Sequence, residues 1–230
     1  MGRELDLKDR TVLVTGGTGG LGRAVVARLL DAGARPVVTW RSERETGDFP
    51  YASRVRLERA DVGDEAAVAR LFSGLGDLWA SVHVVGAFAM SPIADTSAAD
   101  FRKMFEVNAV TCFLCCREAV KAMRRRGGRI VNVAARPAVV PTGGMIPYSV
   151  SKAAVASITQ SLAEEVKGEG ILVNAVLPST MDTPANRAAM PKADFGKWPK
   201  VEEVAETIAF LASPGNALTS GALVPVYGKS

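Results

Sequence analysis

The segment Thr11-Val-Leu-Val-Thr-Gly-Gly-Thr-Gly-Gly-Leu-Gly22 belongs to a chain of 230 residues. It begins with a short apolar run, Thr11 to Thr15, which predicts a buried strand. The glycine-rich loop that follows leads into Gly20 to Ala32, where apolar residues recur at helical spacing and predict a helix. A strand, a glycine loop and a helix in direct succession form a setting in which a phosphate binds the helix N-terminus.

The glycines of this loop match two dinucleotide-binding patterns. Gly17, Gly19 and Gly22 satisfy G-x-G-x-x-G, while Gly16, Gly20 and Gly22 satisfy the looser T-G-x-x-x-G-x-G. Glycine lets the chain turn tightly and approach a pyrophosphate closely. The alternative is a glycine-rich turn without a ligand. The residues that we expect to contact the cofactor here are Gly16, Thr18, Gly20, Leu21 and Gly22.

The end of the second expected strand, Pro36 to Trp40, indicates which nicotinamide cofactor is used. An acid at this place accepts the ribose hydroxyls of NAD, whereas an arginine accommodates the 2′-phosphate of NADP. No acid stands at this strand end, and Arg41 follows it. We therefore expect NADP in preference to NAD. The alternative is that Arg41 is merely exposed and that Glu43 or Glu45 contacts the ribose.

Two later strand ends are expected to contribute to the same site. Asp61 and Val62 follow the third expected strand and would frame the adenine. Gly86 and Ala87 follow the fourth and would let the cofactor pass close to the backbone. In open α/β sheets, ligands bind at the carboxyl ends of the strands, near the switch in strand order.

Short apolar runs alternate with helical patterns along the whole chain. Near-continuous apolar strands separated by helices predict a Rossmann-type, doubly wound parallel sheet in a three-layer α/β/α sandwich. No linker divides residues 1–230, so we expect one domain. The expected strands are residues 11–15, 36–40, 54–59, 82–85, 129–133, 171–176 and 222–226, and the expected helices are 20–32, 64–75, 96–126 (in one or two pieces), 148–167 and 201–212.

Composition argues against several other classes of protein. The net charge is +4, but the basic residues are dispersed, and the one cluster, residues 124–126, suits a helix C-terminus better than a nucleic acid. No apolar run approaches the roughly 20 residues needed to span a bilayer. The first residues contain no signal-peptide core. We expect a cytoplasmic protein that binds neither nucleic acid nor membrane.

The three cysteines, Cys112, Cys115 and Cys116, are too few and too clustered for a disulfide framework. A metal site would need further ligands, and the only histidine, His83, is far away in sequence. We expect the cysteines to be packing residues, His83 to be structural, and no metal to be bound.

The pair Tyr148 and Lys152 carries the expected chemistry. Residues four apart share a helix face, so the lysine ammonium would lie near the phenol and favour its ionised form. Tyr148 would then act as a general acid or base near neutral pH. The alternative, two ordinary residues on a helix surface, becomes weaker because the glycine loop is also present.

These motifs, in this order, resemble the short-chain dehydrogenase/reductase family across nearly the whole chain. The resemblance rests on the glycine loop, Asp61-Val62, Asn108, Tyr148-x-x-x-Lys152, Asn174, Pro178 and Thr183. It implies that Lys152 also holds the nicotinamide ribose, that Asn108 anchors a water leading to it, and that Thr183 helps to hold the carboxamide. Two positions depart from the family: Asn-Asn-Ala-Gly is here His83-Val-Val-Gly86, and Pro-Gly is here Pro178-Ser179.

The C-terminal half also resembles the dihydropteridine reductases. The similar segments are Pro141-Thr-Gly-Gly-Met-Ile-Pro-Tyr148, Asp182-Thr-Pro-Ala-Asn-Arg187 and Met190-Pro-Lys-Ala-Asp-Phe195. The region of about 179–200 is long for a connection, which is typical of a binding loop. Its large side chains would either cover a flat substrate or serve only in packing; they are Met181, Met190, Phe195 and Trp198.

One catalytic position is unusual, because Ala135 stands where the family places a serine, 13 residues before the tyrosine. The serine would donate a hydrogen bond to the reacting carbonyl oxygen, and losing such a donor can cost ~10²–10³ in rate. Thr142 could replace it, or the substrate could need little support, as a quinonoid pterin would. In the third alternative, the chain binds cofactor but reacts slowly or not at all.

Together these patterns predict an NADPH-preferring oxidoreductase that transfers hydride to a carbonyl or a quinonoid imine, with a dihydropteridine-like substrate as one candidate. The catalytic residues would be Tyr148, Lys152 and Asn108, and the cofactor would also contact Pro178 and Thr183. An ordinary ketone, 3-oxoacyl or sugar reductase is the enzymatic alternative, and an NADP-binding regulatory protein the non-enzymatic one. By analogy, the long helices around 97–126 and 147–167 would form the interface of a homodimer or homotetramer.

Overall fold

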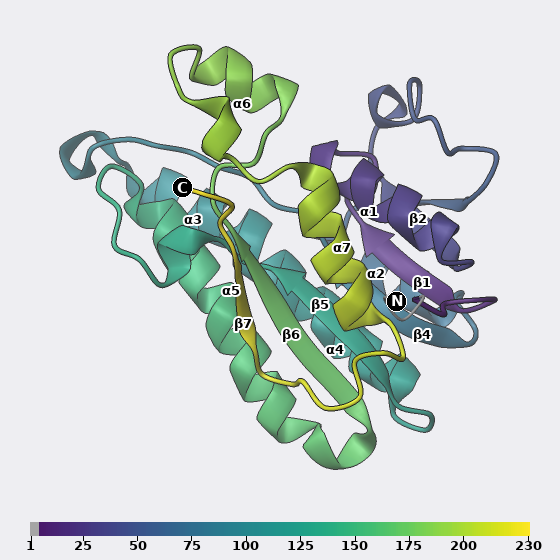
Figure 1. Cartoon of the computed structure of the whole chain (residues 1–230). Coiled ribbons are helices and arrows are strands. Elements are labelled where there is room, and N and C mark those ends of the chain that lie inside the picture. The colour runs from purple at the N-terminus through teal and green to yellow at the C-terminus, as the bar shows by residue number, and fades with distance from the viewer. Residues whose placement is uncertain (1–4) are drawn as a thin grey trace.

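The computed structural model describes residues 5–230 and contains one seven-stranded sheet in which every strand pairs in parallel (Figure 1). The strand order is β3-β2-β1-β4-β5-β6-β7, so the order reverses between β1 and β4. The strands are β1 (Thr11–Thr15), β2 (Arg35–Trp40), β3 (Arg56–Arg59), β4 (Leu78–His83), β5 (Gly128–Val133), β6 (Ile171–Pro178) and β7 (Leu223–Val226). This arrangement confirms the predicted doubly wound, Rossmann-type α/β fold.

Helices cover both faces of the sheet. They are α1 (Gly20–Asp31), α2 (Glu65–Ser73), α3 (Ala98–Phe105), α4 (Thr111–Met123), α5 (Ile146–Glu165), α6 (Pro184–Ala189) and α7 (Val201–Ala212). Successive side chains of a strand point to opposite faces. Val12 and Val14 accordingly pack in a core with α1 and α7, whereas Leu13 packs in a second core with α2, α4 and α5. The result is a three-layer sandwich with two apolar cores.

Most element boundaries agree with the sequence-based prediction within two residues, and the exceptions have clear causes. The fourth strand is β4, Leu78–His83, instead of residues 82–85, because the polar Ser81 interrupts the apolar run from which it was predicted. The helix predicted over residues 96–126 is divided by a π-helical turn, Glu106–Val110, that separates α3 from α4. Asn108 lies in that turn, which changes the direction of its side chain relative to a regular helix.

The segment after β6 is more ordered than the sequence suggested. It contains α6 and a short 3-10 turn, Phe195–Lys197, and projects beyond the sheet in Figure 1. Its base is closed by a backbone bridge between Asp182 and Lys200, and Arg187 forms two hydrogen bonds, 2.6 and 2.7 Å long, with the Asp182 carboxylate. Among the described residues, no helix has the length and apolar character needed to cross a membrane.

Candidate functional site

The sequence-predicted site residues gather along one edge of the sheet, at the carboxyl ends of the strands. The loop after β1 contains Gly16–Gly22, and the segment after β4 contains Gly86 and Ala87. A side chain added to Gly16 would meet the backbone nitrogen of Val85 at 3.0 Å, so these two segments lie side by side. They flank the point at which the strand order reverses, where this class of fold binds ligands.

The glycine loop is packed too tightly to accept side chains at its centre. A Cβ atom at Gly22 would lie 2.1 Å from the carbonyl oxygen of Gly16 and 2.6 Å from Cα of Gly17. Thr18 and Leu21 are buried, whereas Gly19 and Gly20 are exposed at the start of α1. The loop therefore presents bare backbone and a helix N-terminus to the outside, as a pyrophosphate requires.

The end of β2 contains both of the groups that the sequence left in competition. Arg41 is exposed and, within residues 5–230, its guanidinium forms no recorded hydrogen bond or ion pair. The carboxylate of Glu45 folds back onto the strand end, where it accepts hydrogen bonds from the backbone N–H of Arg41 and Ser42, each 3.2 Å long. It also accepts one from the hydroxyl of Thr18 at 3.4 Å. Glu45, five residues after the end of β2, thus places a carboxylate beside the glycine loop.

The third strand end is simpler. Val62 is buried and Asp61 is exposed directly after β3, with the Asp61 carboxylate accepting a hydrogen bond from Gly63 N at 3.0 Å. The backbone N–H of Ala60 donates to the carbonyl of Trp40 at 3.0 Å, which places this segment beside the end of β2. The geometry is compatible with an adenine between these two strand ends.

Asn108 and Lys152 converge on Gly86. A Cβ atom at Gly86 would lie 2.7 Å from Oδ1 of Asn108 and 3.1 Å from Nζ of Lys152. The amide of Asn108 accepts from the backbone N–H of Ala87 and donates to its carbonyl, both at 3.0 Å, and also donates to Oγ of Ser151 at 3.0 Å. Asn108 therefore fixes the segment after β4 against α5.

Lys152 is 5% exposed, and its ammonium donates to the carbonyl of Val133 at 2.8 Å. Burial disfavours the charged amine and lowers the pKa of Lys152 from 10.5 to about 8. The ammonium form still predominates at neutral pH, because the pKa remains above 7.

Tyr148 lies one turn before Lys152 on α5, and its ring packs edge-on against Phe88 with the ring centroids 5.0 Å apart. Burial raises the pKa of Tyr148 to about 12. Desolvation of the phenol thus opposes the expected effect of Lys152 on the phenolate, and that effect stays a prediction. At neutral pH the phenol keeps its proton, which is the form that a proton donor needs.

The position of the missing serine lies beside this pair. Ala135 is 4% exposed and lies two residues after the end of β5, and the short turn after it, Arg136–Ala138, packs against α5. Thr142 is exposed, and its hydroxyl donates to the carbonyl of Val140 at 3.1 Å. The proton of Thr142 is thus used within its own loop, which weakens the hypothesis that Thr142 replaces the serine.

Sequence reasoning missed two polar atoms next to these positions. In residues 5–230, the buried side-chain atoms without a hydrogen-bond partner are Nε of Arg136 and Oγ of Ser149, which follow Ala135 and Tyr148 directly. The Arg136 guanidinium lies over the ring of Tyr227, 5.4 Å from its centroid. Buried polar groups are nearly always paired, so orphaned ones indicate a missing water or ligand. The sequence contained one sign of such an atom, because an arginine, Arg136, directly follows the unusual Ala135.

The segment after β6 reaches the glycine loop. Pro178 is buried at the end of β6, and Thr183 caps α6 by accepting a hydrogen bond from Asn186 N at 3.2 Å. A Cβ atom at Gly20 would lie 3.5 Å from the methyl group of Thr183, so these two predicted cofactor contacts are neighbours. The start of this segment therefore lies beside the N-terminus of α1.

Of the large side chains in this segment, Met181 packs against the core with α1 and α7. Phe195 and Trp198 contact each other with ring centroids 5.0 Å apart, and Met190 is 39% exposed. Packing therefore accounts for Met181, and Met190 remains available to a substrate.

Two other residues singled out in the sequence are structural. Asn174 is buried on β6 and ties the segment before β7 to it, donating to the carbonyl of Thr219 at 2.8 Å and accepting from Ala222 N at 3.0 Å. His83 is buried at the end of β4, where its ring is hydrogen-bonded to Ser81 and Asn132, each at 2.8 Å.

Comparison with known proteins places these features in context. Residues 10–194 match the family model described as short chain dehydrogenase. The chain is 30% identical over 256 residues to an NADPH-dependent aldehyde reductase-like chloroplastic protein of Arabidopsis thaliana, covering 97% of this chain and 95% of the relative. It is 31% identical over 240 residues to the 2-dehydro-3-deoxy-L-rhamnonate dehydrogenase (NAD(+)) of a Sphingomonas species, covering 95% and 94%.

Solved structures agree. A short-chain type dehydrogenase/reductase from Mycobacterium ulcerans superposes with a TM-score of 0.92 at 26% identity, covering 98% of this chain and 90% of that one. One of the two relatives is named for NADPH and the other for NAD(+), so the choice between these cofactors depends on the residues of this chain.

Proposed function

The chain belongs to the short-chain dehydrogenase/reductase family and is thus an oxidoreductase, and from this premise we propose that it is an NADPH-preferring reductase of a carbonyl or a quinonoid imine. The observation that carries this proposal is the convergence of Asn108, Lys152 and the bare backbone of Gly86 beside Tyr148. A side chain at Gly22 or Gly86 would collide with neighbouring protein atoms, so both positions keep bare backbone, which a nicotinamide dinucleotide would approach closely.

Each residue of the site would have a separate role in the reaction. Bound NADPH would supply the hydride. Tyr148, protonated at neutral pH because of its burial, would donate a proton to the substrate oxygen or nitrogen. Lys152 would hold the nicotinamide ribose and keep a positive charge beneath the phenol, and Asn108 would hold the segment at Gly86 in place and support a water leading to Lys152. The pyrophosphate would rest on residues 16–22, and Pro178 and Thr183 would lie against the nicotinamide.

The preference for NADPH rests on Arg41, whose exposed guanidinium is available to a 2′-phosphate. The carboxylate of Glu45 opposes this preference, since it is anchored beside Thr18. We propose that NADPH binding turns or displaces Glu45 and that NADH remains a usable but weaker cofactor.

The substrate class follows from Ala135. With an alanine at this position and the Thr142 hydroxyl engaged by Val140, the site offers little support for a localised oxyanion. A quinonoid dihydropterin needs less support, because its ring delocalises the incoming electrons.

Addition of the serine hydroxyl separates the two substrate classes. Ala135→Ser should leave NADPH oxidation by quinonoid dihydropterin within a few fold of wild type, whereas it should accelerate the reduction of a simple ketone, 3-oxoacyl thioester or keto sugar by about tenfold or more. NADPH oxidation is followed by absorbance, with the non-enzymatic rate subtracted. If wild type reduces a simple carbonyl faster than the pterin, the pterin proposal fails and the ordinary reductase stands.

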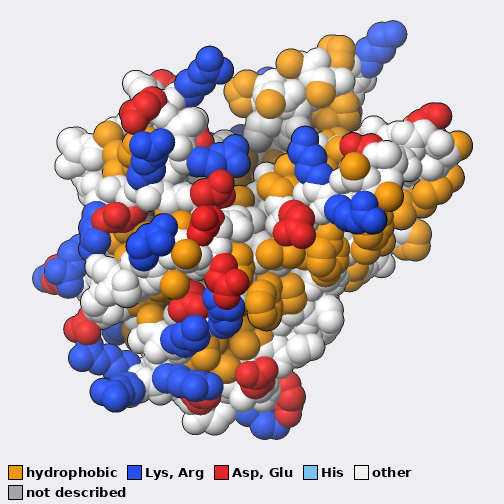
Figure 2. All heavy atoms as spheres, turned by 180° about the vertical axis from the view of Figure 1, so that it is seen from behind, with side chains coloured by type: hydrophobic (Ala, Val, Ile, Leu, Met, Phe, Trp, Pro, Cys, Tyr) orange, Lys and Arg blue, Asp and Glu red, His pale blue; other side chains and the backbone are white. Residues whose placement is uncertain are grey.

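The surface of the molecule also bears on its oligomeric state. Apolar side chains gather on the flank of the molecule that bears α3, α4 and α5 (Figure 2). The exposed large ones there are Phe101, Phe105, Phe113, Ile146 and Val150. Contiguous exposed apolar surface of this kind marks an interface. We propose that this flank joins two copies of a single-domain, cytoplasmic enzyme in a homodimer or homotetramer.

A further inference from the structure

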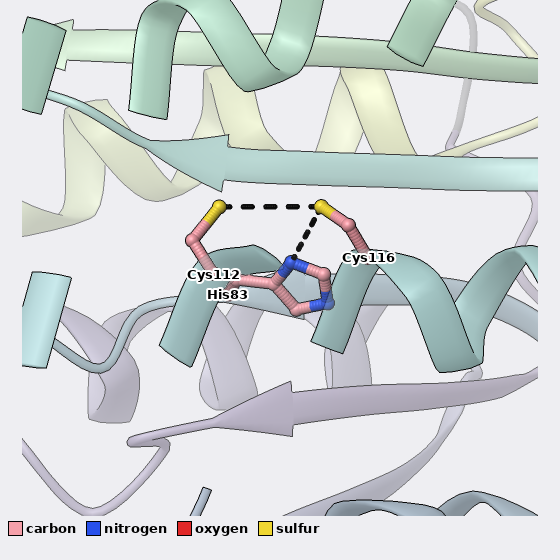
Figure 3. Close-up of side chains that lie close together, drawn as sticks. All are labelled: His83, Cys112 and Cys116. Atoms are coloured by element: carbon pink, nitrogen blue, oxygen red, sulfur yellow. Dashed lines mark hydrogen bonds between the residues drawn. The ribbon is translucent and has the colours of Figure 1, made fainter. Parts of the chain in front are cut away.

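Three side chains that the proposed reaction does not use converge in the core. His83 lies at the end of β4, and Cys112 and Cys116 lie one turn apart on α4 (Figure 3). The two sulfur atoms are 4.0 Å apart, and Sγ of Cys116 is 3.6 Å from Nδ1 of His83. The three ligand atoms all lie within 4.8 Å of one another, and each residue is buried. The fold thus joins groups that are far apart in sequence.

Asn132 on β5 supplies a fourth donor atom. Its Oδ1 lies 2.8 Å from Nδ1 of His83 and 3.5 Å from Sγ of Cys116. In tetrahedral zinc sites the bonds are about 2.3 Å to sulfur and about 2.0–2.2 Å to nitrogen or oxygen, which separates neighbouring ligand atoms by roughly 3.3–3.8 Å. The separations of 4.0 Å between the two sulfurs, 3.6 Å between Cys116 and His83 and 3.5 Å between Cys116 and Asn132 are near these values. The 2.8 Å between Nδ1 of His83 and Oδ1 of Asn132 is a hydrogen-bond distance and would have to lengthen by about 0.5 Å for both atoms to bind one ion.

The surroundings of this cluster resemble the outer support of a metal site. Without a cation, Nδ1 of His83 donates its proton to Oδ1 of Asn132, and Nε2 accepts a hydrogen bond from the hydroxyl of Ser81, each at 2.8 Å. Binding of a cation at Nδ1 would move this proton to Nε2, where the Ser81 hydroxyl can rotate and accept it. The amide nitrogen of Asn132 donates to the hydroxyl of Thr159 at 2.9 Å, which directs Oδ1 of Asn132 toward His83. Such hydrogen bonds fix the tautomer and orientation of ligands in metalloproteins.

We propose that His83, Cys112 and Cys116, assisted by Asn132, form a structural site for a thiophilic divalent cation, of which zinc is the best match. Binding would replace the two thiol protons, which leave as two H⁺, so that two thiolates balance the charge of the cation in a buried place. The site would fasten α4 to β4 and β5 on the side of the sheet that also bears α5. It would stabilise the fold and take no part in the reaction.

The test begins with the metal content of the chain without a histidine tag, expressed in medium supplemented with zinc because the buried site must fill during folding. We expect about one zinc per chain by elemental analysis. Cys112→Ser and Cys116→Ser should each lose most of it. Cys115→Ser is the matched control, since Cys115 is also buried on α4 but lies outside the cluster, and this variant should retain the metal.

A second measurement uses wild type alone and therefore does not depend on whether the variants fold. Protein expressed with cobalt in place of zinc should show thiolate-to-cobalt charge-transfer absorption and the strong d–d bands of a tetrahedral ion, and a chelator present during thermal unfolding should lower its Tm. The proposal is overturned if the reduced protein binds less than a tenth of an equivalent of zinc and shows no thiolate-to-cobalt band. It is also overturned if Cys115→Ser loses metal as completely as its neighbours do.

Discussion

Replacement of Lys152 by methionine should remove a pH-dependent penalty that the folded chain carries. The ammonium of Lys152 is 5% exposed, and burial lowers its pKa from 10.5 to about 8. The difference, 10.5 − 8, is about 2.5 pKa units, and at 1.36 kcal/mol per unit it corresponds to roughly 3 kcal/mol of destabilisation while the amine is charged. The charged form of Lys152 thus destabilises the folded chain.

The sign of the effect follows from proton linkage. Because the folded-state pKa is the lower one, the unfolded chain holds more protons between pH 8 and 10.5, and the free energy of unfolding rises with pH in that window. Relative to Lys152→Met, wild type should gain roughly 2 kcal/mol between pH 7.5 and 10. The raised pKa of Tyr148, about 12, acts in the opposite direction above pH 10 and is common to both proteins.

The assay is urea unfolding of wild type and Lys152→Met at several pH values from 7.5 to 10. The absolute difference at one pH also contains the lost hydrogen bond to Val133, so the change of that difference with pH is the informative quantity. Lys103→Met, at an exposed position on α3, is the control and should run parallel to wild type. Parallel curves for wild type and Lys152→Met would refute the argument that the buried ammonium destabilises the fold.

Further predictions concern the cofactor site. Arg41→Asp should reduce the ratio of NADPH affinity to NADH affinity at least tenfold, and Glu45→Gln should raise this ratio by removing the negative charge near Thr18. Calorimetric titration measures both affinities. An unchanged ratio in Arg41→Asp would show that Arg41 does not contact the 2′-phosphate. Gly22→Ala should cost about 1–3 kcal/mol of unfolding free energy and weaken NADPH binding, because the new methyl group would lie 2.1 Å from a carbonyl oxygen. Gly19→Ala, whose methyl would meet its nearest atom at 3.5 Å, should leave the unfolding free energy nearly unchanged, and equal losses in urea unfolding would contradict the packing argument.

The parts of this protein that sequence alone could predict are those set by local spacing. The strand, loop and helix of residues 11–32 and the helical pair Tyr148 and Lys152 follow from patterns within a few turns of chain. The family resemblance and the fold built on those patterns are confirmed. The roles assigned to individual site residues remain predictions, although the structure brings Gly86, Asn108 and Lys152 together.

Contacts between segments that are distant in sequence could not be predicted from local patterns. The approach of His83 to Cys116 joins two elements 33 residues apart, and the return of Glu45 to Thr18 depends on a short turn after β2. The raised pKa of Tyr148 is not visible in the sequence for a similar reason, since helical spacing places Lys152 nearby but contains no information on desolvation of the phenol. Burial is a property of the whole fold and cannot be read from one helix.

Turnover by Tyr148→Phe tests the central claim most directly. The phenol proton is removed while the ring that packs against Phe88 is kept, so the account predicts that NADPH still binds within a few fold of wild type and that kcat falls by ~10²–10⁴-fold. Binding is measured by titration and turnover by NADPH oxidation with whichever acceptor wild type reduces best. If Tyr148→Phe retains wild-type kcat with its cofactor bound, Tyr148 is not the proton donor and the site must work in another way.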